Sequence, residues 1–411
     1  MGKNTNKQYD LLVIGAGASG MIAAITAARE NKKVCILEKL DKAGKKLLAT
    51  GNGKCNFTND KMSSDCFGGD KAFVNTVLET FTVHDCLAFF HSIGIYPKNK
   101  NGYYYPNSEQ ASSVVAALME ELERKGVEVT YNTDIVEIIS SKDKVTVNTN
   151  QGVFSAKRLI VATGLLAAPK LGSDGSLFGI IKGLGHRFQP ILPALCGFYA
   201  KGLSFKKVSG VRATGTVSAI VEGDMVAQDT GEIQFTDYGI SGIPVFQISR
   251  YLSKALYQKK DTKVTINLLP DWQENQVREE LNHRKNLKTS QPVSMLLNGW
   301  VNQKLSEVIL DLANIDKNQL SGKLSEKDIT YLAEKLQNIE VEITKYRDYE
   351  FAQVCTGGIP VTDVVWDTLE SKYASHVHFA GEILDVDGIC GGYNLHFAWA
   401  TGFIAAKSAC K

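Results

Sequence analysis

The sequence has no long apolar run, and no stretch approaches the ~18 consecutive apolar residues that a membrane span requires. Its opening, MGKNTNKQYD, lacks the apolar core of a signal peptide. Strong net charge is also missing, because 46 Lys and Arg face 44 Asp and Glu. A chain without a strong electrostatic field attracts nucleic acid or anionic membranes only weakly. We therefore expect a cytoplasmic protein that acts on a small molecule, with no nucleic-acid or membrane partner and an oligomeric state that the sequence leaves open.

Metal-binding and disulfide patterns are absent as well. The eight cysteines form no C-x-x-C pair and no cluster with His at metal-ligand spacing. We predict reduced thiols and no metal site. Proline is scarce, at 9 residues against 36 Gly, and 44% of the 411 residues are hydrophobic. This composition indicates a globular α/β protein, long enough for two or three domains.

A glycine turn near the N-terminus separates a short apolar strand from a helix. The turn reads Gly15-Ala16-Gly17-Ala18-Ser19-Gly20. Gly15 permits the tight turn, Gly17 lets the backbone approach a diphosphate, and Gly20 lets the helix lie close to the strand. The free N–H groups of the helix start favour phosphate binding.

A carboxylate completes this pattern. A second strand, 33–37, ends in Glu38 and Lys39, and Glu38 stands where a carboxylate can accept hydrogen bonds from an adenosine ribose. The combination predicts a Rossmann-type dinucleotide site, and on this pattern FAD and NAD are equal candidates.

The next segment is rich in small and amide residues. It runs from Lys42 to Asn59 and contains Lys45, Lys46, Asn52, Gly53, Cys55, Asn56 and Thr58. The lysines suit a diphosphate, and the amides and hydroxyl suit the ribityl chain or ring edge of a flavin. A solvated Gly/Asn turn is the alternative. Cys55 has three interpretations, as a redox partner of flavin, as a covalent anchor for it, or as a small packing residue.

This segment closely resembles one in a bacterial flavoprotein family with two dinucleotide-binding domains, which includes bile-acid 4,6-reductase-like and aminoacetone-oxidase-like proteins. The resemblance extends along the chain and implies FAD as cofactor. It includes Ala162-Thr163-Gly164 after a buried strand, where the family closes over the dinucleotide, and it implies that Val136 touches the adenine through its backbone. Many members of the family carry a second glycine directly after this turn, where the present sequence has Leu165.

The C-terminal part carries the most specific pattern. A strand reaches Gly381, and the following Glu382 and Asp387 precede a helix start. That start reads Gly391-Gly392-Tyr393-Asn394 and leads into a helix to about Ala409. Its backbone N–H groups suit the flavin pyrimidine and the negative charge of reduced flavin.

We predict an α/β protein with a Rossmann-type FAD-binding domain made of residues 1–193 and 346–411. An insertion, 194–345, is predicted as a small β domain (about 194–269 and 338–345) that carries a helical subdomain (about 270–337). Substrate is expected between the insertion and the FAD-binding segments.

No second glycine fingerprint with its strand and acid is present, so no dedicated nicotinamide domain is expected. Flavin must then exchange hydride directly with substrate and with transient NAD(P)H or oxygen. A proton donor is also needed, and His396 and Tyr105 are the candidates. His396 has a second interpretation, as a hydrogen-bonded helix histidine.

Three functions remain open. The first, which we favour, is NAD(P)H-dependent reduction of a conjugated C=C bond in a ketone or steroid-like molecule. The second is oxygen-dependent oxidation of a small amine or aminoketone. The third is a flavin-dependent RNA-modifying or flavin-sensing protein, for which balanced charge gives little support.

Overall fold

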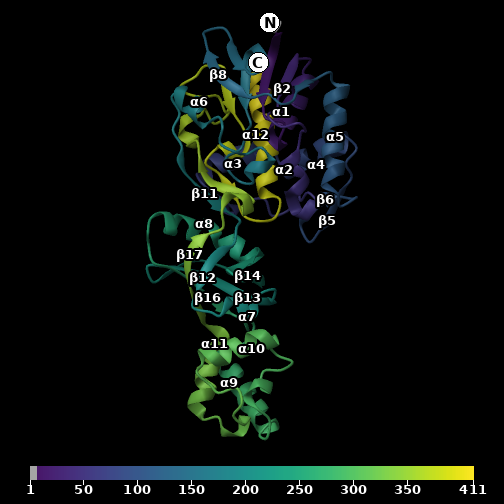
Figure 1. Ribbon diagram of the computed structural model, residues 1–411. Coiled ribbons are helices and arrows are strands. Elements are labelled where there is room, and N and C mark those ends of the chain that lie inside the picture. Colours follow the sequence, from purple (N-terminus) through teal and green to yellow (C-terminus); the bar gives the residue numbers. More distant parts are fainter. Residues whose placement is uncertain (1–6) are drawn as a thin grey trace. The chain divides into compact units, whose positions relative to one another are not determined.

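The computed structural model describes residues 7–411, and the chain divides into two compact units (Figure 1). Unit 1 comprises the residues up to Leu192 together with Gln353–Lys411, and unit 2 comprises Pro193–Ala352. The insertion expected at 194–345 therefore corresponds to unit 2, which extends further toward the C-terminus.

A seven-stranded sheet forms the core of unit 1. Its strand order is β7-β2-β1-β10-β9-β8, and β19 pairs with β10. The strands are β1 (Lys7–Ile14), β2 (Val34–Leu37), β7 (Glu128–Thr130), β8 (Ile135–Ser140), β9 (Val145–Thr149), β10 (Gly152–Val161) and β19 (Val377–Phe379). Each neighbouring pair is parallel within the group formed by β7, β2, β1, β10 and β19. Their apolar runs are buried, as in parallel sheets covered on both faces.

Strand β10 is longer than the sequence pattern indicated. The buried strand expected before Ala162 begins at Gly152 and has ten residues. Its first half pairs antiparallel with β9, and its second half pairs parallel with β19, while β1 pairs with both halves. The charged pair Lys157-Arg158 interrupts the apolar pattern but not the strand.

Helices cover this sheet and bring the C-terminal helix against the first one. They are α1 (Ala18–Arg29), α2 (Lys45–Ala49), α3 (Lys71–Thr80), α4 (Val83–Ser92), α5 (Ala111–Arg124), α6 (Phe178–Gly183) and α12 (Tyr393–Ala409). The helix predicted after Gly392 is confirmed. Helices α1 and α12 pack side by side (Figure 1), and Gly402 allows this because a Cβ there would lie 2.3 Å from the Ser19 carbonyl oxygen.

Three small sheets join distant parts of unit 1. Strands β5 (Pro97–Lys100) and β6 (Tyr103–Pro106) form a hairpin that extends to β3 (Thr58–Asn59). Strand β4 (Phe67–Gly68) pairs with β20 (Asp387–Gly388), and β11 (Gln189–Ala194) pairs with β18 (Val354–Gly358).

Unit 2 contains a closed barrel in the order β12-β15-β14-β13-β16-β17. Its strands are β12 (Phe198–Lys201), β13 (Arg212–Val221), β14 (Asp224–Phe235), β15 (Gly239–Gly242), β16 (Thr262–Asn267) and β17 (Ile339–Tyr346). Its helices are α7 (Phe205–Val208), α8 (Ile243–Tyr257), α9 (Glu274–Leu287), α10 (Gln303–Leu312) and α11 (Glu326–Gln337). Ser325 and Asp328 form a capping box at the start of α11. Helix α8 was missed, although Pro244 in its first turn is a typical start signal.

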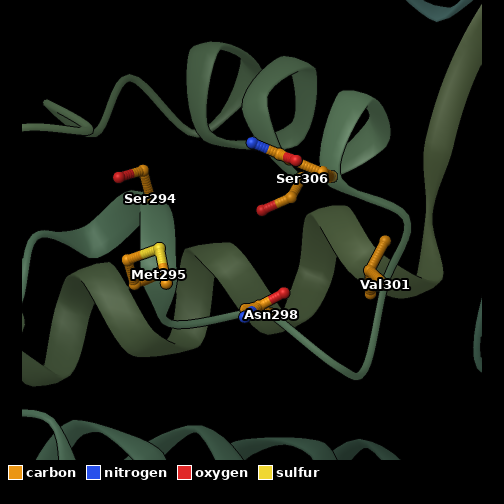
Figure 2. Close-up of a pocket in the computed structure, with 6 residues that line it drawn as sticks. Ser294, Met295, Asn298, Val301 and Ser306 are labelled. Atoms are coloured by element: carbon orange, nitrogen blue, oxygen red, sulfur yellow. The ribbon is translucent and has the colours of Figure 1, made fainter.

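A cavity of about 160 Å³ lies in the helical part of unit 2 (Figure 2). Its lining includes Ser294, Met295, Asn298 and Ser306, all from unit 2, so it is separate from the segments expected to bind FAD. Across residues 7–411, no helix combines the length and the apolarity needed to cross a membrane.

Candidate functional site

The glycine turn has the geometry that a dinucleotide requires. Gly15 has φ of +101°, and a Cβ there would lie 2.6 Å from the Ala162 carbonyl oxygen. A Cβ on Gly20 would lie 1.9 Å from the Gly15 oxygen, so any side chain would separate helix and turn. Gly17 instead faces open space, with no atom within 4 Å of its Cβ position, and no side chain caps α1. Ala18 and Ser19 begin this helix, whose uncapped N–H groups fit a diphosphate.

The Glu38 carboxylate is fixed at the carboxyl end of β2. It is 8% exposed and accepts hydrogen bonds from the backbone N–H of Ala16, at 2.6 Å, and of Leu40, at 2.8 Å. Each oxygen keeps lone-pair capacity for a ribose hydroxyl. The Thr133 N–H donates to the Glu38 carbonyl, and Val136, three residues further, is exposed. Lys39, at the same edge, pairs with Asp174.

Four distant segments meet around Glu382. Lys46 Nζ lies 2.7 Å from Glu382 Oε2, and the Cys355 N–H donates to Oε1 at 2.9 Å. A Cβ on Gly164 would lie 3.3 Å from Oε2, and one on Gly381 would lie 2.5 Å from the Ser19 hydroxyl. The structure therefore brings the Ala162-Thr163-Gly164 turn, helix α2 and the C-terminal loop to the start of α1.

The two neighbouring lysines diverge. Lys45 forms an exposed pair with Asp41, four residues earlier, rather than joining Lys46 beside Glu382. Of the two lysines, only Lys46 therefore contacts Glu382, another residue predicted to bind FAD.

A second group of predicted residues lies at the start of α12. Gly392 has φ of +91°, and its Cβ position is 2.8 Å from both Asn56 Oδ1 and the Thr58 carbonyl oxygen. The Asn394 side chain donates to the Gly388 carbonyl and accepts from its N–H, each at 2.8 Å, which fixes the loop at Asp387. No side chain caps α12, and Tyr393 is buried at its first position.

The Asn52 loop presents its backbone rather than its thiol. Asn52 and Gly53 are exposed and both have positive φ, as does Cys55, at +58°. Cys55 is buried, and burial raises the pKa of its thiol to about 12. The thiol is therefore protonated at neutral pH, which favours the packing interpretation over a reactive thiolate.

One segment of this region was not predicted from the sequence. Thr356, Gly357 and Gly358 follow Cys355, and a Cβ on Gly358 would lie 2.6 Å from the Ile383 carbonyl oxygen. The Thr356 hydroxyl is buried without a hydrogen-bond partner among residues 7–411, so it is available to a ligand. The sequence signal that could have identified this segment is the pair Gly357-Gly358 at the end of a short apolar run.

These residues fit FAD, and similarity to known proteins agrees. Residues 9–408 match the family model described as "HI0933-like protein Rossmann domain". The chain belongs to this HI0933-like family. It is 40% identical over 402 residues to a 3-dehydro-bile acid Δ(4,6)-reductase of Clostridium scindens, which covers 97% of this chain and 98% of the relative. The HI0933-like chain is an FAD-dependent oxidoreductase.

Other similar proteins extend this picture. A ribosomal RNA dihydrouridine synthase of Haemophilus influenzae is 30% identical over 405 residues, covering 97% of each chain. The solved Sdh1 complex of Mycobacterium smegmatis in the apo form has a TM-score of 0.50 and 13% identity, and covers 98% of this chain and 68% of that one. The last likeness supports the fold alone.

His396 is enclosed by protein in this HI0933-like chain. It is fully buried on α12, with Nδ1 2.8 Å from the Thr58 hydroxyl and Nε2 3.1 Å from the Phe81 carbonyl oxygen. Burial lowers its pKa to about 4, so the ring is neutral at pH 7. The carbonyl can only accept, so Nε2 carries the proton and Nδ1 accepts from Thr58. Both nitrogens are used, which favours the structural interpretation.

Tyr105 is placed differently. It lies half-buried on β6, and its ring is 3.8 Å from the Cβ position of Gly51. Burial raises the pKa of its phenol, which therefore stays protonated at neutral pH and can donate a proton.

Replacing Lys46 with Met should weaken FAD binding at least about tenfold, because a charge-assisted contact beside Glu382 is lost. Lys45→Met is the matched control and should change FAD affinity less than about twofold, since exposed pairs contribute little. Fluorescence titration of apoprotein with FAD measures both. Equal effects of the two substitutions would contradict the placement of Lys46.

Replacing His396 with Gln should reduce the fall in the free energy of unfolding that occurs as the pH drops below 7. The folded ring resists protonation down to about pH 4, whereas the unfolded ring binds a proton below about pH 6.5, so the free energy of unfolding falls as pH drops through this window. The His396 contribution to this loss is about 3 kcal/mol, so the loss should be smaller by about that amount in His396→Gln, while His378, whose pKa burial also lowers to about 4, keeps its own contribution. Urea denaturation at pH 7 and pH 4.5 measures it. A folded, FAD-loaded variant that retains the pH dependence but loses turnover would support the catalytic interpretation instead.

Proposed function

We propose that this protein reduces a C=C bond conjugated to a carbonyl in a steroid-like ketone, with NAD(P)H as the electron donor. The similarity to the Clostridium scindens reductase, 40% over nearly the full length of both chains, carries this proposal. Bound FAD supplies hydride transfer between the nicotinamide and the substrate. NAD(P)H and one proton are consumed for each bond reduced, with hydride added to the β-carbon and a proton to the α-carbon or the enolate oxygen.

In this proposal the protein positions the cofactor and delivers the proton. The start of α1 and Lys46 would hold the diphosphate, Glu38 would hold the adenosine ribose, and Glu382 would hold the ribityl chain. The uncapped start of α12, behind Gly391 and Gly392, provides backbone N–H groups that stabilise negative charge at the flavin end. Tyr105 donates the proton, because its phenol is protonated and lies beside the Asn52 loop.

A second candidate reaction follows from the Haemophilus influenzae relative, which is named as a ribosomal RNA dihydrouridine synthase. Uridine also carries a C=C bond conjugated to a carbonyl, so the same hydride and proton transfers would serve. The chain's net charge of +2 does not supply the strong positive surface that RNA binding favours. The small ketone therefore remains the preferred substrate.

Anaerobic mixing with NADH or NADPH should bleach the flavin, and a 3-keto steroid with conjugated double bonds should restore its absorbance. Peroxide release with a small amine, and dihydrouridine formation in ribosomal RNA, test the two alternatives in parallel. Failure of both nicotinamides to bleach the flavin would overturn the proposed reductase.

Replacing Tyr105 with Phe should lower kcat about a hundredfold, the usual contribution of a general acid, while FAD stays bound. Tyr104→Phe is the matched control, since Tyr104 is the next residue of β6 and points to the opposite face. Its kcat should change less than about twofold. Equal losses, or none in either variant, would exclude Tyr105 as the proton donor.

A further inference from the structure

The hairpin formed by β5 and β6 gathers lysines and tyrosines on one face. Lys98 stands directly opposite Tyr105, and Lys100 stands opposite Tyr103. Residues directly opposite in an antiparallel pair project to the same side of the sheet. Asn99 and its neighbour Tyr104 take the other side. One face of the hairpin is therefore both cationic and aromatic.

One carboxylate holds three lysines at this face. Glu109 Oε1 lies 2.7 Å from Lys98 Nζ and 2.6 Å from Lys100 Nζ, and Oε2 lies 3.6 Å from Lys54 Nζ. The lysine side chains remain 41–52% exposed. Hydrogen bonds from Lys100 and Lys98 lower the pKa of Glu109 to about 2, so this carboxylate is ionised. Three cations and one anion leave an excess of two positive charges that reach solvent.

This lysine cluster, Lys54, Lys98 and Lys100, borders the loops at the proposed flavin end. Tyr103 lies 2.9 Å from the Cβ position of Gly391. Lys100 Nζ lies 6.0 Å from the centroid of the Tyr105 ring, at the limit of cation–π contact. Lys54 itself belongs to the Asn52 loop. The positive charge is therefore close to where hydride and proton transfer are proposed.

We infer that this cluster binds the diphosphate of the nicotinamide dinucleotide. The inference rests on the proposed NAD(P)H-dependent function and supplies a site that the chain otherwise lacks, since the sequence shows no second dinucleotide fingerprint. The diphosphate carries two negative charges, matching the excess, and one ribose separates it from the reacting nicotinamide. The two tyrosines provide flat surfaces for ring stacking. The carboxylate of a steroid acid fits poorly, because it lies across the rigid ring system from the 3-keto end.

The test uses the FAD-loaded protein and ADP-ribose, which carries the diphosphate but no reactive nicotinamide. Calorimetry should show at least about tenfold weaker ADP-ribose binding in Lys98→Ala/Lys100→Ala than in the unmodified protein, given the loss of two charge-assisted contacts. Anaerobic flavin reduction should show a similar rise in the apparent Kd for NAD(P)H. Reoxidation of dithionite-reduced enzyme by a neutral enone steroid should be unchanged.

Lys263→Ala/Lys345→Ala removes the same charge from the barrel of unit 2 and should leave ADP-ribose binding unchanged. Equal weakening in both double variants would show a general charge effect and overturn the site. Loss of ribosomal RNA binding with intact ADP-ribose binding would assign the lysines to RNA phosphate instead. Because ADP-ribose binding needs no turnover, failure of the proposed reductase and failure of this site give different results.

Discussion

The structure of unit 1 depends on the pairing of β10 with β1 and β19. Val161 lies opposite both Ile14 and Phe379, so three strands end at the same level. The Ala162 N–H donates to the Ile14 carbonyl at 2.9 Å, and the Ala380 N–H donates to the Val161 carbonyl at 3.0 Å. Ligands of open α/β sheets bind at the carboxyl ends of the strands, and this register places three of the turns predicted to bind FAD there together.

Most of the packing in the site follows from that register. The turns after β1, β10 and β19 approach closely enough that Gly15, Gly164 and Gly381 leave no room for side chains. Glu382 then accepts from Lys46 and from the Cys355 N–H, which ties helix α2 and strand β18 to the same edge. Segments separated by more than 300 residues thus form one cradle of backbone N–H groups and fixed polar side chains.

Local signals predicted the parts of this cradle but not their partners. The turn from Gly15 to Gly20, Glu38 and the start of α12 each follow from short-range chemistry, because a turn or helix start needs particular residues. The split between Lys45 and Lys46 did not, because adjacent lysines on a short helix look equivalent until Asp41 and Glu382 are placed. The sequence could not decide whether His396 is a proton donor or a hydrogen-bonded helix histidine, because its contacts with Thr58 and Phe81 depend on long-range packing.

The fold shows the same division. The helix starting at Tyr393 was predictable from the Gly391-Gly392 pair before it, whereas α8 was hidden within a β-rich stretch and β10 continues through the charged pair at Lys157. The contacts at Thr356 depend on strand β18, whose role appears only once Glu382 reaches Cys355. Tertiary pairing, rather than local propensity, decided each of these cases.

The placement of FAD is the central claim, and a crystal structure of the FAD-loaded protein tests it most directly. The account predicts the diphosphate at the start of α1, the adenosine ribose at Glu38 and the flavin ring at the start of α12 beside Gly391 and Gly392. A flavin ring bound away from the α12 start, or a diphosphate without contact to the Gly17 turn, would contradict it.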